Sequence, residues 1–514
     1  MTPSLLCAAS RPDGPPCRAP SGRVLALGAA FALAAAGAAP AGSPPGAPIG
    51  RSPAIPVETV VLANGLKVVV SRDPTAPVVA VAMAFGAGGR SEPRGRAGFA
   101  HLFERLMFEG SKHAPKGQFD RILESYGGDN NASTHEDFTI FYEVLPSNAL
   151  PVALWLDADR LADLDLGKES LRNQVSVVKE ERRMRVDNEP YGRLLHVDIA
   201  SRAFSNWQNS HPVIGSAEDY DAVVLGAAED FFKAYYAPRN GALAIVGDVD
   251  AVQALAWARE YFEWIPNRGE PAPADFAEPE PGPPPGGGPP CPPGATRPCA
   301  TPSRWAWLAD PHARLPAFAA AWGGLPERRT ADYYALLLVG QALFDGKSSR
   351  LYQELVKRVQ VAVSVQGGLG FPLVEDPLEY KAPGSLGGWV VHKAQSTPLR
   401  VKDLVMRQVS RIAERGVDAK ELARLKTSLR SKWVRSQETC LGRARMLLTS
   451  ALLDGDPAAV NGELERFMAV TPEDTRRAAA RYLRPDNAVL FSVAPGGARP
   501  EDRSAVPRSP RGGK

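Results

Sequence analysis

Hydrophobic residues recur at two different spacings along the chain. Apolar residues at consecutive or alternate positions predict β-strands at Val57–Leu62, Leu66–Val70 and Val78–Phe85. Asn64 and Gly65 separate the first two strands, and this pair is typical of the tight turn in a β-hairpin. The patterned region is therefore expected to begin as a sheet.

Other segments place apolar residues three or four positions apart, which is the spacing of an amphipathic helix. Between them, Asp129–Val144 is polar at first and then alternates, as expected of one strand with one solvated face. Leu243–Gly247 is predicted to be a buried strand. The helices predicted in this part are Gly98–Ser111, Gln118–Tyr126, Ala149–Leu164 and Ser170–Asn188.

The same kinds of element return after residue 302. A strand is predicted at Ala317–Trp322, followed by helices at Ala331–Leu343, Ser349–Arg358 and Asp418–Ser436. A Tyr, Pro, Asn pattern also precedes the last apolar strand of each part, 247 residues apart. Its members are Tyr235, Pro238, Asn240, Tyr482, Pro485 and Asn487. The repeat predicts two homologous halves.

The predicted fold class is α+β, with two halves that each contain an antiparallel-dominated sheet and helices packed on one face. A linker dominated by Pro and Gly, which is not expected to pack a core, joins the halves. The predicted boundaries are 1–40 for a signal peptide, 41–55 for a disordered spacer, 56–265 for the first half, 266–302 for the linker, 303–497 for the second half and 498–514 for a disordered tail.

The N-terminus predicts export. Basic residues precede the apolar run Val24–Ala36, and small residues follow it, which is the order of a secretory signal. We expect the protein in the periplasm or cell envelope, either freed by cleavage or anchored by the uncleaved signal. In an exported chain Cys291 and Cys299 can form a disulfide that closes a small loop in the linker.

Charge argues against one class of partner. The chain has 60 Lys and Arg residues against 57 Asp and Glu residues, a formal net charge of +3, and no long run of one sign. This balance gives no indication of nucleic-acid binding.

The candidate chemistry lies on the helix predicted at Gly98–Ser111. His101, Glu104 and Arg105 are spaced i, i+3 and i+4, so they share one face. A His and a Glu at this spacing can hold a divalent metal and poise a water beside it. The order resembles the motif H-x-x-E-H, in which both His bind zinc and the Glu is the general base.

The chain resembles the pitrilysin/insulinase family of zinc peptidases, the inverzincins, from about Val57 to Val493. In that family a Glu lies 76 residues beyond the second His of the motif and completes the zinc site, and Glu181 lies 76 residues beyond position 105. The resemblance implies one zinc ion held by His101 and Glu181, with Glu104 as the catalytic base.

The resemblance also implies a substrate and a partner. In the family the strand at Asn131 and Ala132 binds a peptide or unfolded segment as an added β-strand. Bacterial short members form dimers in which the partner subunit carries a substrate-gripping Arg and Tyr; the corresponding positions here are Val356 and Val363. We therefore expect a homodimer, or a heterodimer with a related subunit, in which this chain resembles the metal-bearing subunit.

Arg105 departs from the family pattern because a guanidinium stays protonated and offers no lone pair to zinc. It is expected to pair with Glu104 and Glu181 instead, and Gln174 further lowers the local negative charge. A replacement ligand would have to be His113 or His135, neither of which has the i+4 geometry. The other histidines are expected to be surface or loop residues: His196, His211, His312 and His392.

Three hypotheses follow from this departure. The first is an exported, catalytically impaired member that binds peptide or serves as a partner subunit. The second is an active zinc endopeptidase that uses Glu104 as general base, with two protein ligands or a replacement ligand. The third is a structural subunit that binds no peptide. Zinc content separates the first two, and peptide binding separates the first from the third.

Overall fold

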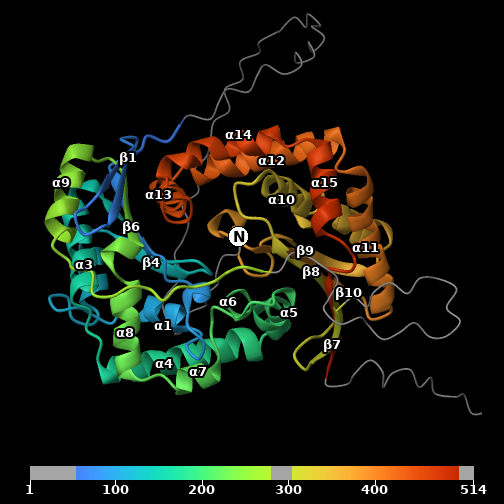
Figure 1. Ribbon diagram of the computed structural model, residues 1–514, viewed down its shortest axis with the longest axis horizontal. Coiled ribbons are helices and arrows are strands. Elements are labelled where there is room, and N and C mark those ends of the chain that lie inside the picture. The colour runs from blue at the N-terminus through green and yellow to red at the C-terminus, as the bar shows by residue number, and fades with distance from the viewer. Residues whose placement is uncertain (1–53, 279–303, 375, 497–514) are drawn as a thin grey trace, which may run out of the picture. The chain divides into compact units, whose positions relative to one another are not determined.

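The computed structural model describes residues 54–278, 304–374 and 376–496, which form two β-sheets surrounded by helices (Figure 1). The fold class is α+β, as predicted. The first half contributes a six-stranded sheet and the second half a five-stranded sheet. The strands are β1 Glu58–Val61, β2 Lys67–Arg72, β3 Val78–Phe85, β4 Asp129–Thr134, β5 Thr139–Pro146, β6 Gly241–Gly247, β7 Arg304–Asp310, β8 Ala317–Leu325, β9 Ala362–Leu369, β10 Gly384–His392 and β11 Val489–Pro495.

The two sheets have the same topology. Their orders are β1-β2-β6-β3-β5-β4 and β7-β11-β8-β10-β9, so each strand from β2 to β6 has a counterpart in the second sheet, with β1 as an addition. One pair in each sheet is parallel, β2 with β6 and β7 with β11, and the other neighbours are antiparallel. The side-chain amide of Asn240 donates to the Tyr235 carbonyl (2.7 Å), and Asn487 donates to Tyr482 (3.5 Å). The predicted duplication is confirmed.

Helices follow the strands in both halves. In the first half they are α1 Phe99–Leu106, α2 Gln118–Ser125, α3 Leu150–Ala162, α4 Lys168–Arg182, α5 Ile199–Ala203, α6 Trp207–Ser210, α7 Ala217–Asp221, α8 Leu225–Tyr235 and α9 Ala251–Phe262. In the second half they are α10 Ala331–Phe344, α11 Pro398–Arg415, α12 Ala419–Ser436, α13 Cys440–Thr449, α14 Glu463–Ala469 and α15 Pro472–Tyr482. Short π-helical turns extend or join several of them, including Arg183–Asp187, Leu194–Asp198 and Tyr352–Arg358.

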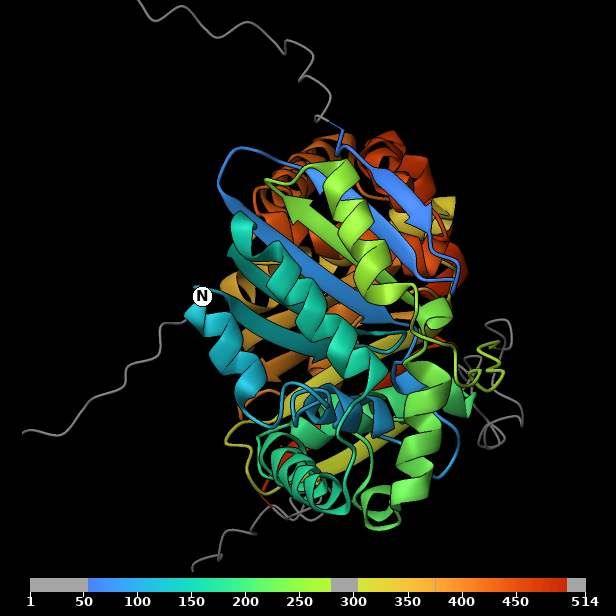
Figure 2. The same ribbon diagram turned by 90° about the vertical axis from the view of Figure 1, so that its left-hand side faces the viewer.

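One face of each sheet packs against helices of its own half. In the first sheet, alternate large residues of β3 such as Met83 and Phe85 enter a core with α1, α3 and α8. Figure 2 shows α3 and α9 lying across these strands. In the second sheet, Phe318 and Trp322 of β8 join the core formed with α10, α11 and α15. This part of the prediction, helices on one face, is confirmed.

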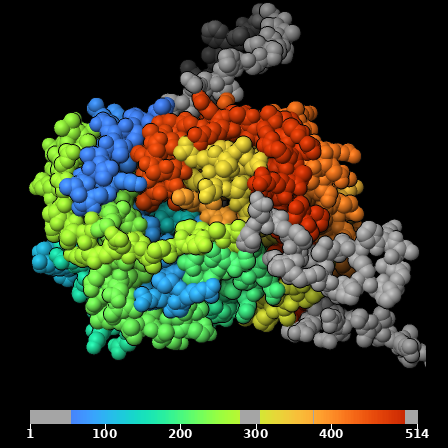
Figure 3. All heavy atoms as spheres, in the orientation of Figure 1, coloured from blue at the N-terminus to red at the C-terminus, as the bar shows by residue number. Residues whose placement is uncertain are grey.

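The opposite face of each sheet is covered by the other half. Ala82 and the other small residues of β3 pack against α13, a helix of the second half. Ala319 and its neighbours on β8 pack against Leu194 and Ile199 of the first half. Figure 3 shows the red C-terminal helices directly beside the blue N-terminal strands. The alternation of large and small residues along β3 therefore assigns one face to each half.

Two predicted elements differ from the structure. The helix predicted at Gly98–Ser111 ends at Leu106, and the last residues of the prediction are not helical: Gly110 has a φ of 130°, which no helix allows, and Ser111 forms a β-bridge with Leu164. The single strand predicted at Asp129–Val144 is the hairpin of β4 and β5. Its polar first part pairs with its apolar second part, so the change in pattern marked a turn.

The predicted linker begins differently from expectation. Its first residues, up to Glu278, pack against the first half: the Glu278 carboxylate accepts hydrogen bonds from the amides of Ser205 (2.9 Å) and Asn206 (3.0 Å). The predicted signal, the rest of the linker with Cys291 and Cys299, and the predicted tail lie outside the described residues. The domain boundaries stay predictions. Of the described helices, none is long and apolar enough to cross a membrane.

Candidate functional site

A buried carboxylate fixes the start of α1, the helix that carries the candidate chemistry. Glu92 accepts hydrogen bonds from the backbone amides of Gly98 (2.8 Å) and Ala100 (2.7 Å). Free amides and the positive end of the helix dipole make this position favourable for an anion. Gly98 has a φ of 93°, and a Cβ at this residue would lie 2.3 Å from the Tyr220 hydroxyl. The entry into α1 therefore requires glycine.

The two sides of α1 have different roles. Phe103 on its apolar side stacks on Phe231, with ring centroids 5.3 Å apart, and contacts Tyr236. The polar side carries His101, Glu104 and Arg105, which are half-buried. The three residues share one face, as predicted. Packing of the apolar side fixes the orientation of the helix about its axis, so this face points away from the core.

Glu181 reaches this polar side from α4, which packs against α1. His101 Nε2 lies 3.2 Å from Glu181 Oε2, and the Arg105 guanidinium donates to the same oxygen. Arg185 approaches the other oxygen, with its NH1 3.3 Å from Oε1. The predicted pair of Arg105 and Glu181 is confirmed, and both carboxylate oxygens of Glu181 are engaged.

These contacts stabilise the charged form of Glu181. The hydrogen bond and charge of His101, followed by those of Arg105, lower the pKa of Glu181 to about 2, although burial acts in the opposite direction. The carboxylate is therefore ionised at neutral pH, and two guanidinium groups lie against it. A divalent cation at this position would have to displace Arg105 and meet the charge of Arg185.

The residues at this position do not fit a catalytic zinc ion. Such sites use three protein ligands and leave a fourth position to water. His101 and Glu181 could supply two, and Arg105, which donates to the same carboxylate, has no lone pair to give. Within the described ranges, no group of three or more His, Cys, Asp or Glu is arranged to hold a metal.

Glu104 is held by the neighbouring strand. Its Oε2 accepts a hydrogen bond from the Thr134 hydroxyl on β4 (2.6 Å) and lies 3.9 Å from His101 Nδ1. We expected Glu104 to pair with Arg105, but Arg105 points to Glu181 and Thr134 takes that place. Gln174 lies on α4, seven residues before Glu181, and its side-chain amide donates to Glu109 (2.7 Å).

The strand β4 contains the predicted substrate-binding residues and lies at the end of the first sheet's strand order. The backbone amide of Ala132 donates to the Asn131 side chain (2.8 Å), not to β5. Alternate residues of an antiparallel strand direct their backbone groups to opposite sides, so Ala132 faces the open edge. An extended peptide can pair with such an edge.

A cavity of about 1010 Å³ lies beside these residues. Its walls come from both halves: His101 and Ser133 to Glu136 from the first half, and Leu369, Glu379 and Arg445 from the second. The cavity has the size of pockets that hold small ligands or a few peptide residues. The β4 edge, the polar side of α1 and the second half thus enclose one space.

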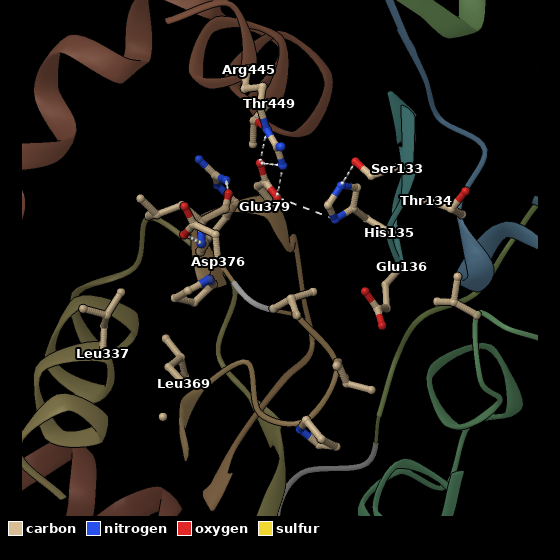
Figure 4. A pocket seen from close by; sticks show the side chains of 18 of the residues that line it. Ser133, Thr134, His135, Glu136, Leu337, Leu369, Asp376, Glu379, Arg445 and Thr449 are labelled. Carbon is tan, nitrogen blue, oxygen red and sulfur yellow. Dashed lines mark hydrogen bonds and ion pairs between the residues drawn. The ribbon is translucent and has the colours of Figure 1, made fainter. Parts of the chain in front are cut away.

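A chain of polar contacts crosses this cavity, and sequence reasoning missed it (Figure 4). The Ser133 hydroxyl lies 2.9 Å from His135 Nε2, and His135 Nδ1 lies 3.5 Å from Glu379 Oε2. Arg445 on α13 donates three hydrogen bonds to Glu379, at 2.8, 3.1 and 3.2 Å. No spacing in the sequence relates residue 135 to residues 379 and 445, so only folding brings them together.

The two candidate replacement ligands contact residues other than His101 and Glu181. His113 Nδ1 lies 2.6 Å from Asp159, while His135 contacts Ser133 and Glu379.

One expectation about the histidines was wrong: His392 is fully buried at the end of β10. His211 lies in the loop after α6, as expected, but its side chain is buried against Glu92, with its Nε2 3.2 Å from that carboxylate. Both contact residues that are distant in sequence: His211 contacts Glu92, and the backbone amide of His392 donates to the carbonyl of Pro316. Of the positions that correspond to the gripping Arg and Tyr, Val356 is half-buried in the second core and Val363 is exposed on β9.

Comparisons with known proteins identify the same family as the sequence motifs. The family model "Insulinase (Peptidase family M16)" matches residues 67–217, and the model "Peptidase M16 inactive domain" matches residues 223–429. The zinc protease PqqE of Helicobacter pylori is 30% identical over 311 residues, which cover 59% of this chain and 65% of that protein. An uncharacterized zinc protease of Streptomyces coelicolor is 24% identical over 441 residues, 84% of this chain and 89% of that protein.

Solved structures show the same fold. A protease from Helicobacter pylori superposes with a TM-score of 0.76 at 24% identity, covering 86% of this chain and all of the other (100%). The periplasmic protease PqqL of Escherichia coli gives a TM-score of 0.63 at 17% identity, over 86% of this chain and 48% of that one. Since the two family models match consecutive regions that include strands of both sheets, the chain belongs to the insulinase, or M16, family of zinc peptidases.

Proposed function

We propose that this chain is an exported, catalytically impaired M16-family protein that binds extended peptides in its cavity, alone or as the partner subunit of an active relative. Export is inferred from the signal-like N-terminus, and a structural relative named a periplasmic protease agrees with it. Dimer formation with itself or a related subunit is part of the proposal because short bacterial members share that organisation.

One observation carries the impaired metal site: the guanidinium of Arg105 donates to Glu181 Oε2, where His101 also points. Arg105 replaces a zinc ligand and at the same time satisfies the carboxylate that zinc would need. The helices α1 and α4 therefore remain docked without a cation between them. Loss of a ligand should weaken zinc binding by more than the roughly 10- to 100-fold that loss of an outer hydrogen-bond partner causes.

Peptide binding is supported by the open edge of β4. The backbone of Ala132 faces the open edge of β4, and the next residues of the strand, Ser133 and Thr134, line a cavity with walls from both halves, so a peptide paired with β4 would reach into that cavity. Neither feature needs a metal. Recognition through backbone hydrogen bonds favours extended segments over a defined sequence.

The decisive experiment is to compare zinc content and peptide cleavage in the wild type, Arg105→His and Arg105→Gln. Arg105→His supplies a third neutral ligand and should carry about one zinc per chain. Arg105→Gln removes the competing charge but adds no such ligand, so it separates the two effects. Changing Glu104 to Gln in the Arg105→His background should abolish any restored cleavage while zinc stays bound.

The outcomes are distinct. If the wild type carries stoichiometric zinc and cleaves peptides as fast as Arg105→His, the chain is an active zinc endopeptidase and the proposal is wrong. If the wild type neither carries zinc nor binds an unfolded peptide, it is a structural subunit. A restored zinc site without cleavage would point to the missing Arg and Tyr of a partner subunit.

A further inference from the structure

Glu136 is a buried residue at the cavity wall that forms no ion pair with another described residue. Glu136 follows β4, lines the cavity and is only 8% exposed. Its own backbone amide and the charge of Arg90 favour the ionised form of this carboxylate, but burial outweighs both. Figure 4 marks no hydrogen bond or ion pair between Glu136 and the other side chains drawn, whereas the neighbouring His135 points to Glu379.

Hydrogen bonds hold the backbone around Glu136 in place beside the cavity. The amide of Arg90 donates to the Glu136 carbonyl (2.8 Å), and Gly89 donates to the carbonyl of His135 (3.1 Å). A Cβ on Gly88 would lie 2.3 Å from the Glu136 carbonyl oxygen. The glycines before α1 therefore let this turn approach closely and hold Glu136 in place.

The cations near Glu136 are already committed. Arg90 forms an ion pair with Asp137 (2.9 Å) and donates to Asn209 (3.0 Å), and its guanidinium lies over the ring of Tyr380. Arg445 is bound to Glu379 across the cavity. Adjacent acids thus differ: Asp137 is paired and Glu136 is not. Burial raises the pKa of Glu136 to about 8, so the side chain is mostly protonated at neutral pH while no cation is present.

Burying a carboxyl group costs free energy unless a hydrogen-bond or ion-pair partner replaces the water that it loses. We propose that Glu136 binds a cationic group of the peptide, either a Lys or Arg side chain or the α-ammonium of its N-terminus. This inference rests on the proposed peptide-binding function and adds the class of substrate. Glu136 lies two residues beyond Thr134, the partner of Glu104, so a peptide paired with β4 would bring such a group within reach.

The test uses the full chain and three peptides of one extended sequence: a neutral N-acetylated form, an N-acetylated form with one Lys, and a neutral form with a free α-amine. Affinities are measured by calorimetry for the wild type and for Glu136→Gln, which preserves shape. One cationic peptide should bind roughly 10- to 100-fold more tightly than the neutral one, the usual effect of a charge-assisted hydrogen bond. This preference should vanish in Glu136→Gln.

Asp345→Asn is the matched control. Asp345 lines the same cavity, but Lys432 pairs with it at 2.7 Å, so loss of its charge should leave the preference intact. A second readout is proton release: a cation that ionises a protonated Glu136 should release a proton near pH 7 in the wild type and not in Glu136→Gln.

Each result decides between the proposals. Equal binding of all three peptides to the wild type, or a preference that survives Glu136→Gln, overturns the role of Glu136 and leaves peptide binding standing. If none of the three peptides binds, the proposed function itself fails. Which cationic peptide gains affinity identifies the side chain or the α-ammonium as the recognised group.

Discussion

The helices α1 and α10 occupy equivalent places, each following the central strand of its sheet, β3 or β8, yet they have opposite surroundings. In α10 eleven of fourteen residues are buried, and it presents Leu337 and Gln341 to the cavity. In α1 five of eight residues are buried, and His101 faces the cavity. The same topology thus produced a core helix in one half and a helix with a polar side in the other.

The difference shows which helix of a duplicated fold can carry polar side chains that face a cavity. The second core surrounds α10 with β9, α11, α12, α14 and α15, so a polar group there would lose its hydration without gaining a partner. The helix α1 contacts α4, α8, β4 and β5 and remains open toward the cavity. Charged side chains are therefore tolerated on the cavity side of α1, whereas the one on α10, Asp332, lies in its first turn and pairs with Arg477.

The largest expected effect comes from placing a charged residue on α10 and an apolar residue on the polar side of α1. Leu338→Glu on α10 should unfold the second half or cost more than about 4 kcal/mol, because a fully buried side chain would become an unpaired charge. Glu104→Leu on α1 should change stability by less than about 1 kcal/mol, since Glu104 is only half-buried.

Urea unfolding followed by circular dichroism measures both variants. Leu338→Ala serves if Leu338→Glu does not fold, with an expected cost of about 2–5 kcal/mol. Similar tolerance of a charge in α1 and α10 would contradict the comparison.

The second prediction concerns the pH dependence of stability at Glu136, and a smaller effect is expected. Glu136 lies in the turn after β4, whereas the residue after the equivalent strand β9 is Gly370, which has no ionisable side chain. The folded pKa of about 8 lies above the ordinary value of 4.5, so the native state keeps a proton that the unfolded chain loses. This contribution to stability is complete below pH 4.5 and is lost as pH rises through 8. Glu136→Gln should therefore match the wild type near pH 4 and exceed it near pH 9 by on the order of 3 kcal/mol.

The measurement is the free energy of unfolding of both proteins at the two pH values. The quantity compared is the difference between variant and wild type, which cancels the titration of other groups. A difference that does not change with pH would mean that the carboxyl group is better solvated than its burial indicates.

The smallest effect concerns the small residues that each half presents to the other. Ala82→Leu on β3 and Ala319→Leu on β8 should each cost about 1–3 kcal/mol, since both residues are fully buried under helices of the opposite half. Thermal unfolding measures both. Val252→Ala, at a residue that is 76% exposed, should stay within about 0.5 kcal/mol. If only one of the two alanine variants is destabilised, the halves do not cover each other symmetrically.

Local pattern was sufficient for much of the first sheet and for the face of α1. The turn at Asn64 and Gly65, the strand β3 and the spacing of His101, Glu104 and Arg105 depend on neighbouring residues, so the sequence alone determined them. The repeat ending at Asn487 also predicted the shared topology, because the same side-chain amide is used before the last strand of both sheets.

Other features depended on residues far apart in the chain. Nothing near residue 136 indicates that Arg90 is taken by Asp137, and nothing near His135 indicates Glu379 and Arg445 across the cavity. Burial of His211 and His392 likewise follows from packing between elements. Side-chain identity and spacing determine which chemistry a helix can offer, whereas the pairing and desolvation of each charge are decided by what the tertiary structure places beside it.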